Sequence, residues 1–129
     1  MVLYLRKNYS RERQRRSMEK EKLIKAKIDY ENGKKRFAGK EDLYQKYLLK
    51  FKEDPHFAGA REAFFAKDYE MLLKETHALK GVAGTLGILT VYQASADIVT
   101  AIRAEEIDAI PDLYEILSSS YEKIIEILE

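Results

Sequence analysis

The 129-residue sequence predicts an all-α protein, namely an antiparallel four-helix bundle with one or two lesser helices added at its N-terminal end. Its composition is that of a folded globular chain, because 46% of the residues are hydrophobic and 35% are charged. Only six glycines and two prolines interrupt it. Apolar residues recur at steps of three and four over four amphipathic segments, and short connections join these segments.

The N-terminal part of the chain is strongly basic. Residues 1–40 carry 14 Lys+Arg and 5 Asp+Glu, a net charge of +9, whereas the other 89 residues carry 9 and 17, a net charge of −8. We expect residues 1–17 to be a basic N-terminal extension and residues 18–129 to form the bundle domain. A polar helical pattern covers residues 11–28, and the glycine-containing stretch 31–42 breaks it.

Two helices are expected next. The first, over residues 40–54, is predicted to bury an apolar stripe and to end at Pro55. This stripe consists of Leu43, Tyr47 and Phe51, with Tyr44 and Leu48 alongside. The second is a short helix between Gly59 and Lys67.

Three longer helices complete the bundle. Asp68 is a suitable N-cap for a helix that Gly87 ends, with Leu72, Thr76, Leu79, Ala83 and Leu86 as its buried stripe. Thr90 is expected to cap the next helix, which turns Val91, Ala94, Ile98 and Ala101 inward. Pro111 begins the last helix, whose apolar residues are Leu113, Ile116, Leu117, Tyr121, Ile124, Ile125 and Leu128.

Several classes of protein are excluded or disfavoured. The chain has no cysteine, so it can form neither a disulfide nor a thiolate metal site. Its two histidines, His56 and His77, lack the spacing of a metal site, and we interpret His56 as an incidental loop residue. There is no phosphate-binding glycine loop, nucleophile elbow or acid–base pair of an enzyme. No secretory pattern or long apolar run is present, so a cytoplasmic protein without nucleic-acid or membrane partners is expected.

The helix over residues 68–86 carries a second stripe outside its core. At about 100° per residue, Leu73, His77, Lys80, Gly81 and Gly84 fall on this second side. Each internal glycine costs about 1 kcal/mol of helix stability relative to alanine, and the core stripe is complete without them. Close approach of another molecule would explain them.

These residues suit phosphoryl transfer to and from histidine. An exposed imidazole is a nucleophile, and a lysine three residues later can hold phosphate. His77 is therefore the candidate acceptor and Lys80 the candidate phosphate-stabilising residue, with Leu73, Gly81 and Gly84 as the docking surface for a partner.

The segment "HALKGVAGTLG" resembles the histidine-containing phosphotransfer (HPt) domain of multistep phosphorelays. The family signature is His, any residue, Leu, Lys, Gly and a further Gly ten residues after the His. It falls on His77, Leu79, Lys80, Gly81 and Gly87, and the resemblance spans about residues 24–126.

The resemblance implies a phosphocarrier without kinase activity of its own. His77 would accept a phosphoryl group from an aspartate of one receiver domain and pass it to another, Lys80 would steady the group, and Gly81 would leave it room. Receiver domains and a hybrid histidine kinase are the implied partners. The receiver would supply Mg²⁺, so this chain is expected to bind no cofactor or metal.

Two positions depart from the family. Thr85 stands where many members have asparagine, and Val99 stands where members in chemotaxis-type kinases have a glutamate that orients the histidine, unless nearby Asp97 substitutes. The second departure favours exchange with receiver domains. The alternative function is a non-catalytic helical interaction module whose basic arm binds nucleic acid or membrane.

Overall fold

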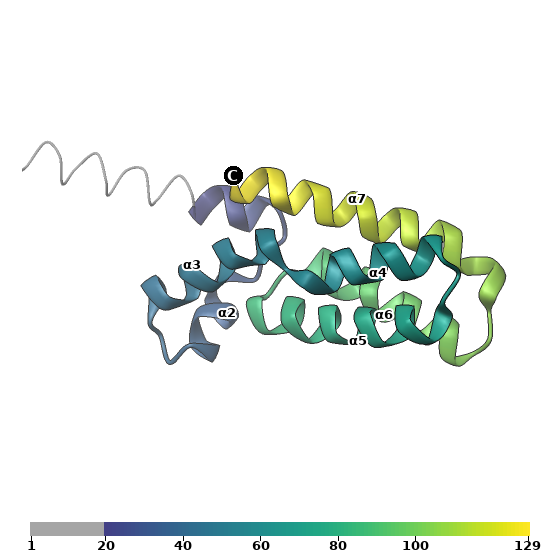
Figure 1. Ribbon diagram of the computed structural model, residues 1–129. Helices are drawn as coiled ribbons and strands as arrows, with labels where there is room; N and C mark the ends of the chain where they lie inside the picture. Colours follow the sequence, from purple (N-terminus) through teal and green to yellow (C-terminus); the bar gives the residue numbers. More distant parts are fainter. Residues whose placement is uncertain (1–19) are drawn as a thin grey trace, which may run out of the picture.

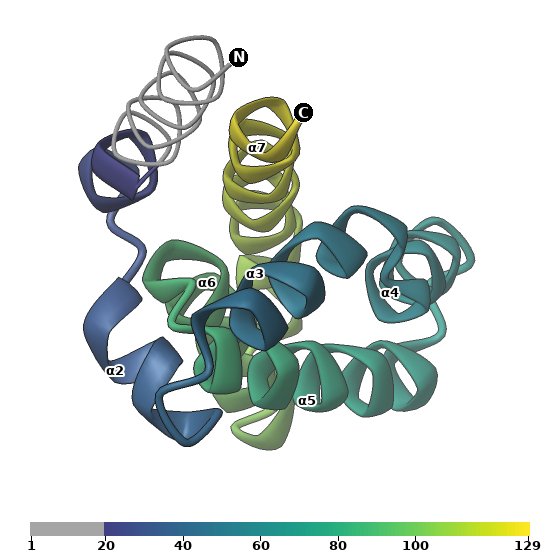
Figure 2. The same ribbon diagram turned by 90° about the vertical axis from the view of Figure 1, so that its left-hand side faces the viewer.

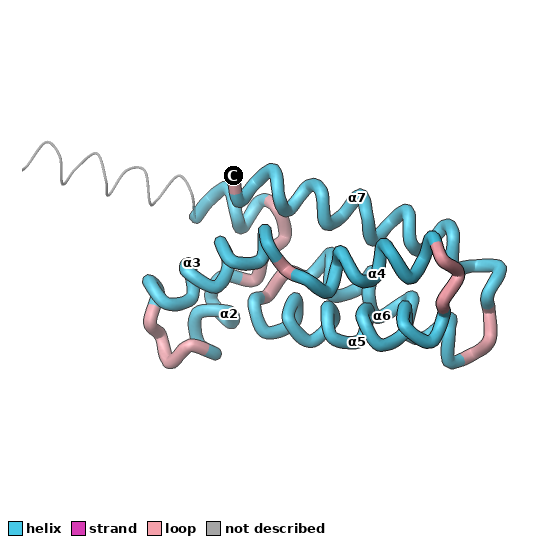
Figure 3. Tube along the Cα trace, in the orientation of Figure 1, coloured by secondary structure: helices cyan, strands magenta, loops and turns pink. Residues whose placement is uncertain are grey.

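The computed structural model of this protein describes residues 20–129, which are almost entirely helical (Figures 1 and 3). A helical segment at residues 20–25 is followed by α2 (Tyr30–Arg36), α3 (Glu41–Lys50), η1 (Phe51–Glu53), α4 (Pro55–Phe65), α5 (Tyr69–Leu86), α6 (Leu89–Arg103), η2 (Ile107–Ala109) and α7 (Ile110–Leu128). No β-strand occurs within residues 20–129, where Ile28 and Ile88 form an isolated antiparallel bridge. The all-α prediction is confirmed. The predicted extension at residues 1–17 and the proposed domain start at Met18 lie outside the described residues.

The four longer helices α4 to α7 lie along one another (Figure 1). The fourth member of this group is α4, whereas the sequence predicts the helix over residues 40–54 in that place. Helix α5 packs against both α4 and α6, and α6 packs against α7. Stacked aromatic rings join α4 to α7, with Phe57 on Tyr121 at 3.9 Å and Phe64 on Tyr114 at 4.0 Å between ring centroids. Helices α2 and α3 lie at one end of this group, towards the viewer in Figure 2. No helix of the described part is long and apolar enough to cross a membrane.

Helix α5 follows the sequence prediction closely. The Asp68 carboxylate caps it by accepting a hydrogen bond from the Met71 N–H at 3.1 Å. All five residues of its predicted core stripe are buried. Gly87 ends the helix with a φ of 75°, in the left-handed region that glycine adopts without strain. Both ends and the buried face of α5 are therefore set by local signals.

Of the five residues in the predicted stripe, α3 and η1 bury three, which form a narrower stripe of their own. Tyr44, Leu48 and Phe51 are buried, whereas Leu43 is 37% exposed and Tyr47 is 43% exposed. Both stripes have helical spacing, so periodicity does not choose between them. The tertiary structure does, because the Tyr44 hydroxyl donates a 2.6 Å hydrogen bond to the Leu86 carbonyl at the end of α5.

The predicted break at residues 31–42 is correct only for residues 37–40, where Gly39 has a φ of 74°, because α2 continues through Asn32 and Gly33. A Cβ at Gly33 would collide with the ring and hydroxyl of Tyr44, so this glycine serves close packing of α2 on α3. The Asp29 side chain caps α2 by accepting from the Asn32 N–H at 3.4 Å. A glycine that serves packing was thus mistaken for one that ends a helix.

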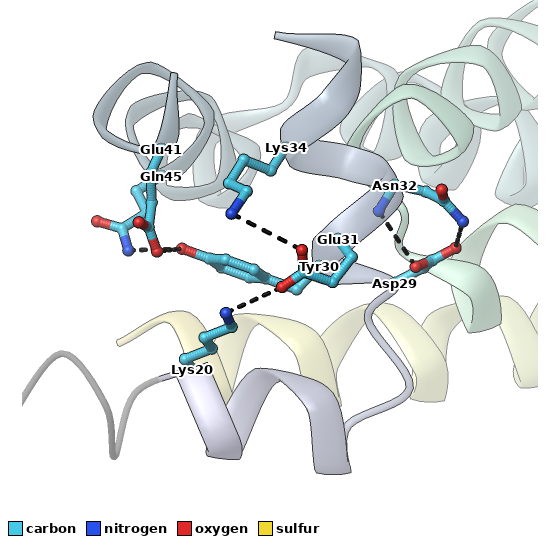
Figure 4. A network of polar contacts seen from close by, with 8 residues as sticks. All are labelled: Lys20, Asp29, Tyr30, Glu31, Asn32, Lys34, Glu41 and Gln45. Carbon is cyan, nitrogen blue, oxygen red and sulfur yellow. Dashed lines mark hydrogen bonds and ion pairs between the residues drawn. The ribbon is translucent and has the colours of Figure 1, made fainter. Parts of the chain in front are cut away.

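Polar contacts hold α2 in place (Figure 4). The Tyr30 hydroxyl donates to Glu41 Oε1 at 2.6 Å and accepts from Gln45 Nε2 at 2.8 Å, which ties α2 to α3. The Lys20 ammonium lies 2.9 Å from Glu31 Oε1 and ties the segment at residues 20–25 to α2.

Two predicted helix boundaries are also wrong. The helix expected between Gly59 and Lys67 is α4, which begins already at Pro55, where Asp54 caps it by accepting from the His56 N–H at 2.8 Å. The helical run before it ends just ahead of Pro55, as predicted, with η1. Helix α6 begins at Leu89 with Ile88 as its N-cap and no side-chain cap, so Thr90 lies inside the helix. This early start follows from the tight turn at Gly87, after which the Ile88 N–H bonds to the Ala83 carbonyl at 2.9 Å.

The inward faces of α6 and α7 agree largely with the prediction. Val91, Ala94, Ile98 and Ala101 are buried on α6, and Pro111 lies in the first turn of α7. On α7 the exception is Ile116, which is 55% exposed. The buried positions of α7 are Ile110, Tyr114, Leu117, Tyr121, Ile124 and Leu128.

Candidate functional site

The five predicted site residues lie on α5, on the side away from its buried stripe. We call this group, Leu73, His77, Lys80, Gly81 and Gly84, the His77 face. His77 and Gly81 are exposed, and the other three are half-buried. The prediction that His77 lies outside the core is confirmed.

The His77 imidazole has no bonded partner among residues 20–129. Its ring makes no hydrogen bond or ion pair with any of them. Val99, the position aligned with the orienting glutamate, is buried on α6. Asp97 is engaged elsewhere, since its Oδ1 accepts from Gln93 Nε2 at 2.9 Å. Within the described chain, His77 is thus an accessible nucleophile without an orienting carboxylate.

The two internal glycines of the His77 face have different surroundings. A Cβ at Gly81 would meet no heavy atom within 4 Å, so the surface one helical turn from His77 is open. A Cβ at Gly84 would lie 3.1 Å from Cδ2 of Tyr92, whose ring comes from the first turn of α6. The expectation that packing needs neither glycine is correct for Gly81 and wrong for Gly84.

Lys80 is directed towards the same tyrosine. Its Nζ lies 5.7 Å from the centroid of the Tyr92 ring, in a cation–π geometry. This contact places the ammonium over α6 and limits its freedom. Tyr92 is a residue of the site that sequence analysis missed, because no local pattern on α6 indicates which residue of α5 it faces.

A second cation lies at the C-terminal end of α5. Arg36 Nη1 of α2 donates to the Thr85 carbonyl at 3.2 Å, and the Thr85 hydroxyl donates to the Gly81 carbonyl at 2.9 Å. The guanidinium satisfies a carbonyl near the negative end of the helix dipole. Arg36 was also missed, since α2 was not predicted as a helix.

An apolar groove of about 700 Å³ adjoins the His77 face and shares Gly81 with it. Helix α5 forms one wall, and the other comes from α3, η1 and the end of α2. Its main apolar lining residues are Phe37, Tyr47, Phe51, Ala78 and Val82. The open glycine therefore belongs both to the His77 face and to the edge of this groove.

The expectation that His56 lies in a loop is wrong. It lies in the first turn of α4, and its Nδ1 is 2.9 Å from Glu75 Oε2 on α5. No pattern in the sequence indicates that Glu75 meets His56, which lies 19 residues earlier in the chain. No group of three or more His, Asp or Glu side chains in the described part is placed to hold a metal ion.

Comparison of the chain with known protein families, with curated proteins and with solved structures finds no match.

Proposed function

We propose that this chain is a histidine phosphotransfer protein, in which His77 accepts a phosphoryl group from an aspartate of a receiver domain and passes it to another receiver in a multistep phosphorelay. The observation that carries the proposal is an exposed imidazole without a bonded partner in the described chain, beside a glycine with open space around it. The alternative, an interaction module without phosphate chemistry, leaves this arrangement unexplained.

The transfer step uses the lone pair of one imidazole nitrogen. This nitrogen attacks the phosphorus of the aspartyl phosphate, the new N–P bond forms, and the P–O bond to aspartate breaks. The carboxylate leaves with the electron pair, and the ring carries the positive charge until it releases a proton. In the reverse direction, the carboxylate of a second receiver takes the group from His77.

Charge around His77 supports this chemistry. Lys80 follows His77 by three residues on α5, and its ammonium, which lies over the Tyr92 ring, can attract the phosphoryl oxygens during transfer. The receiver's Mg²⁺ would provide most of the charge stabilisation in the transition state. The chain itself therefore needs no cofactor and no kinase activity of its own.

The packing of α4 to α7 supports the matching architecture, an antiparallel four-helix bundle within residues 18–129. Each of these helices contacts the next in the chain, and the stacked aromatic rings place α4 in contact with α7. Within this group α5 packs against α4 and α6, and its exposed His77 face is the side that we propose a partner meets. We propose receiver domains and a hybrid histidine kinase as partners, in the cytoplasm.

The test uses the two histidines of the chain as each other's control. A receiver carrying radiolabelled phosphate is mixed with the wild-type chain, with His77→Gln and with His56→Gln. We expect acid-labile label on the wild type and on His56→Gln, and none on His77→Gln. Helicity and melting temperature should be the same in the wild type and His77→Gln, because His77 is exposed, and circular dichroism should show that His56→Gln is folded. Labelling of His77→Gln at the wild-type rate would refute the proposal.

A further inference from the structure

The His56–Glu75 pair has the geometry of a prepared nucleophile. His56 Nδ1 and Glu75 Oε2 are 2.9 Å apart, and an ionised carboxylate only accepts hydrogen bonds. The N–H of a neutral imidazole must therefore be on Nδ1, which leaves the lone pair on Nε2. The side chain of His56 is 37% exposed, whereas that of Glu75 is only 20% exposed.

The surrounding residues hold this pair in position. A Cβ at Gly59 would lie 2.7 Å from Cδ of Glu75, so the carboxylate approaches α4 only because residue 59 is glycine. The backbone of His56 is fixed as well, since its N–H donates to Asp54 Oδ1 at 2.8 Å. His56 thus has the orienting carboxylate that His77 lacks among the described residues.

We infer that His56 is a second phosphoryl-accepting histidine, which reacts at Nε2 with small phosphoryl donors such as phosphoramidate or an acyl phosphate. The Nε2 lone pair forms the N–P bond, and the bond between phosphorus and the leaving group breaks. With zwitterionic phosphoramidate, ammonia departs with the electron pair and needs no further proton. The proton on Nδ1 stays, the ring becomes an imidazolium, and the Glu75 carboxylate stabilises its charge.

The inference does not depend on the function proposed for His77. Neither a receiver domain nor the His77 face takes part in it. The chain contains two histidines, so His77→Gln leaves His56 as the single imidazole that can react. A failure at His56 therefore leaves the proposal for His77 untouched, and the reverse also holds.

The experiment treats the His77→Gln chain with phosphoramidate. Mass spectrometry follows the rate of uptake, and ³¹P NMR identifies the phosphohistidine isomer. We expect one phosphate on His56, attached at Nε2. Adding Glu75→Gln should slow uptake about tenfold or more, because the amide holds the ring without compensating its charge. Adding Gly59→Ala should also slow it, because the new methyl group displaces the carboxylate.

A matched control is Glu70→Gln, which removes the same charge from an exposed position in the first turn of α5. It should leave the rate unchanged. In the His77→Gln chain with Glu75 intact, the absence of phosphate on His56, or a phosphate attached at Nδ1, would overturn the inference. Equal rates for the Glu75→Gln and Glu70→Gln chains, both folded by circular dichroism, would also overturn it.

Discussion

At the scale of single residues, Gly81 and Gly84 show how one residue type serves two purposes on the same helix. Gly81 has open space where a side chain would be, and Gly84 makes room for the Tyr92 ring. Only Gly81 therefore leaves surface for a partner beside His77. Gly84 acts indirectly, since it seats the ring over which the Lys80 ammonium lies.

Substitutions at the two glycines should separate these purposes. Gly81→Ala should stabilise the protein by up to about 1 kcal/mol, because alanine is the better helix former and nothing blocks its methyl group. Gly84→Ala should gain less, because the methyl group presses on Tyr92. Gly81→Leu should slow transfer from a receiver by crowding His77. Urea unfolding and transfer rates test this, and transfer by Gly81→Leu at the wild-type rate would contradict the docking role.

Lys80→Ala should slow the proposed transfer without abolishing it, because the imidazole would make the new bond and the receiver's Mg²⁺ would carry most of the charge stabilisation. The difference from wild type should shrink as salt rises, since the lysine is partly exposed to screening ions. Lys123→Ala on α7 removes the same charge from an exposed site and serves as the control. A loss as complete as that of His77→Gln would mean that the lysine has a role beyond attraction.

At the scale of elements, the turn between α5 and α6 is the place where α2 and α3 are bonded to the four longer helices. The Asp29 N–H donates to the Gly87 carbonyl at 2.8 Å, and Tyr44 and Arg36 bond to the two carbonyls just before it. The last carbonyls of α5 have no partner within the helix, so groups from α2 and α3 satisfy them. The end of the site helix is thus fixed by elements that precede it in the chain.

Two alanine substitutions at left-handed glycines should measure this attachment. Gly39 and Gly87 have φ values of 74° and 75°. An alanine at either position would therefore have a backbone strain of about 1–2 kcal/mol. Around Gly39 a Cβ meets nothing within 4 Å, whereas at Gly87 it would lie 2.6 Å from the Asp29 carbonyl oxygen. Gly87→Ala should therefore destabilise the chain more than Gly39→Ala in urea unfolding. Equal losses would show that the approach of Asp29 to the turn is unimportant.

At the scale of the whole molecule, tyrosine hydroxyls make several of the hydrogen bonds that join one helix to another. Burial is the main cause that raises the pKa of Tyr30, Tyr44, Tyr114 and Tyr121, and it raises the pKa of Tyr44 to about 12. Tyr121 also donates from α7 to the Phe51 carbonyl at 3.1 Å. The hydroxyls of Tyr30, Tyr44 and Tyr121 are therefore bound as neutral donors in the folded state.

The raised pKa values predict a loss of stability at alkaline pH. Below pH 10 the tyrosines are neutral in both states, and their contribution is complete. Above that value the unfolded chain releases protons first, so the free energy of unfolding should fall as pH rises from 10 to about 12. Tyr44→Phe should cost about 1 kcal/mol at neutral pH through the lost hydrogen bond, but should make this fall shallower. Urea unfolding across this pH range gives the test, and an unchanged slope in Tyr44→Phe would contradict it.

The sequence by itself determined the helical class, the limits of α5 and the faces of its residues. Asp68, Gly87 and the five-residue stripe are local signals, because a cap acts within one turn and a buried face repeats with the helical period. The exposure of His77 follows from the same period. These features need no knowledge of where another helix lies.

Only the tertiary structure decided which residues meet across helices. It placed Tyr92 over Gly84, Tyr44 against Gly33 and His56 beside Glu75, and each of these contradicted an interpretation made from the sequence. The physical reason is that periodicity fixes the direction of a side chain about its own helix axis. Contacts between helices depend also on their relative rotation and translation, which the packing of the whole core sets.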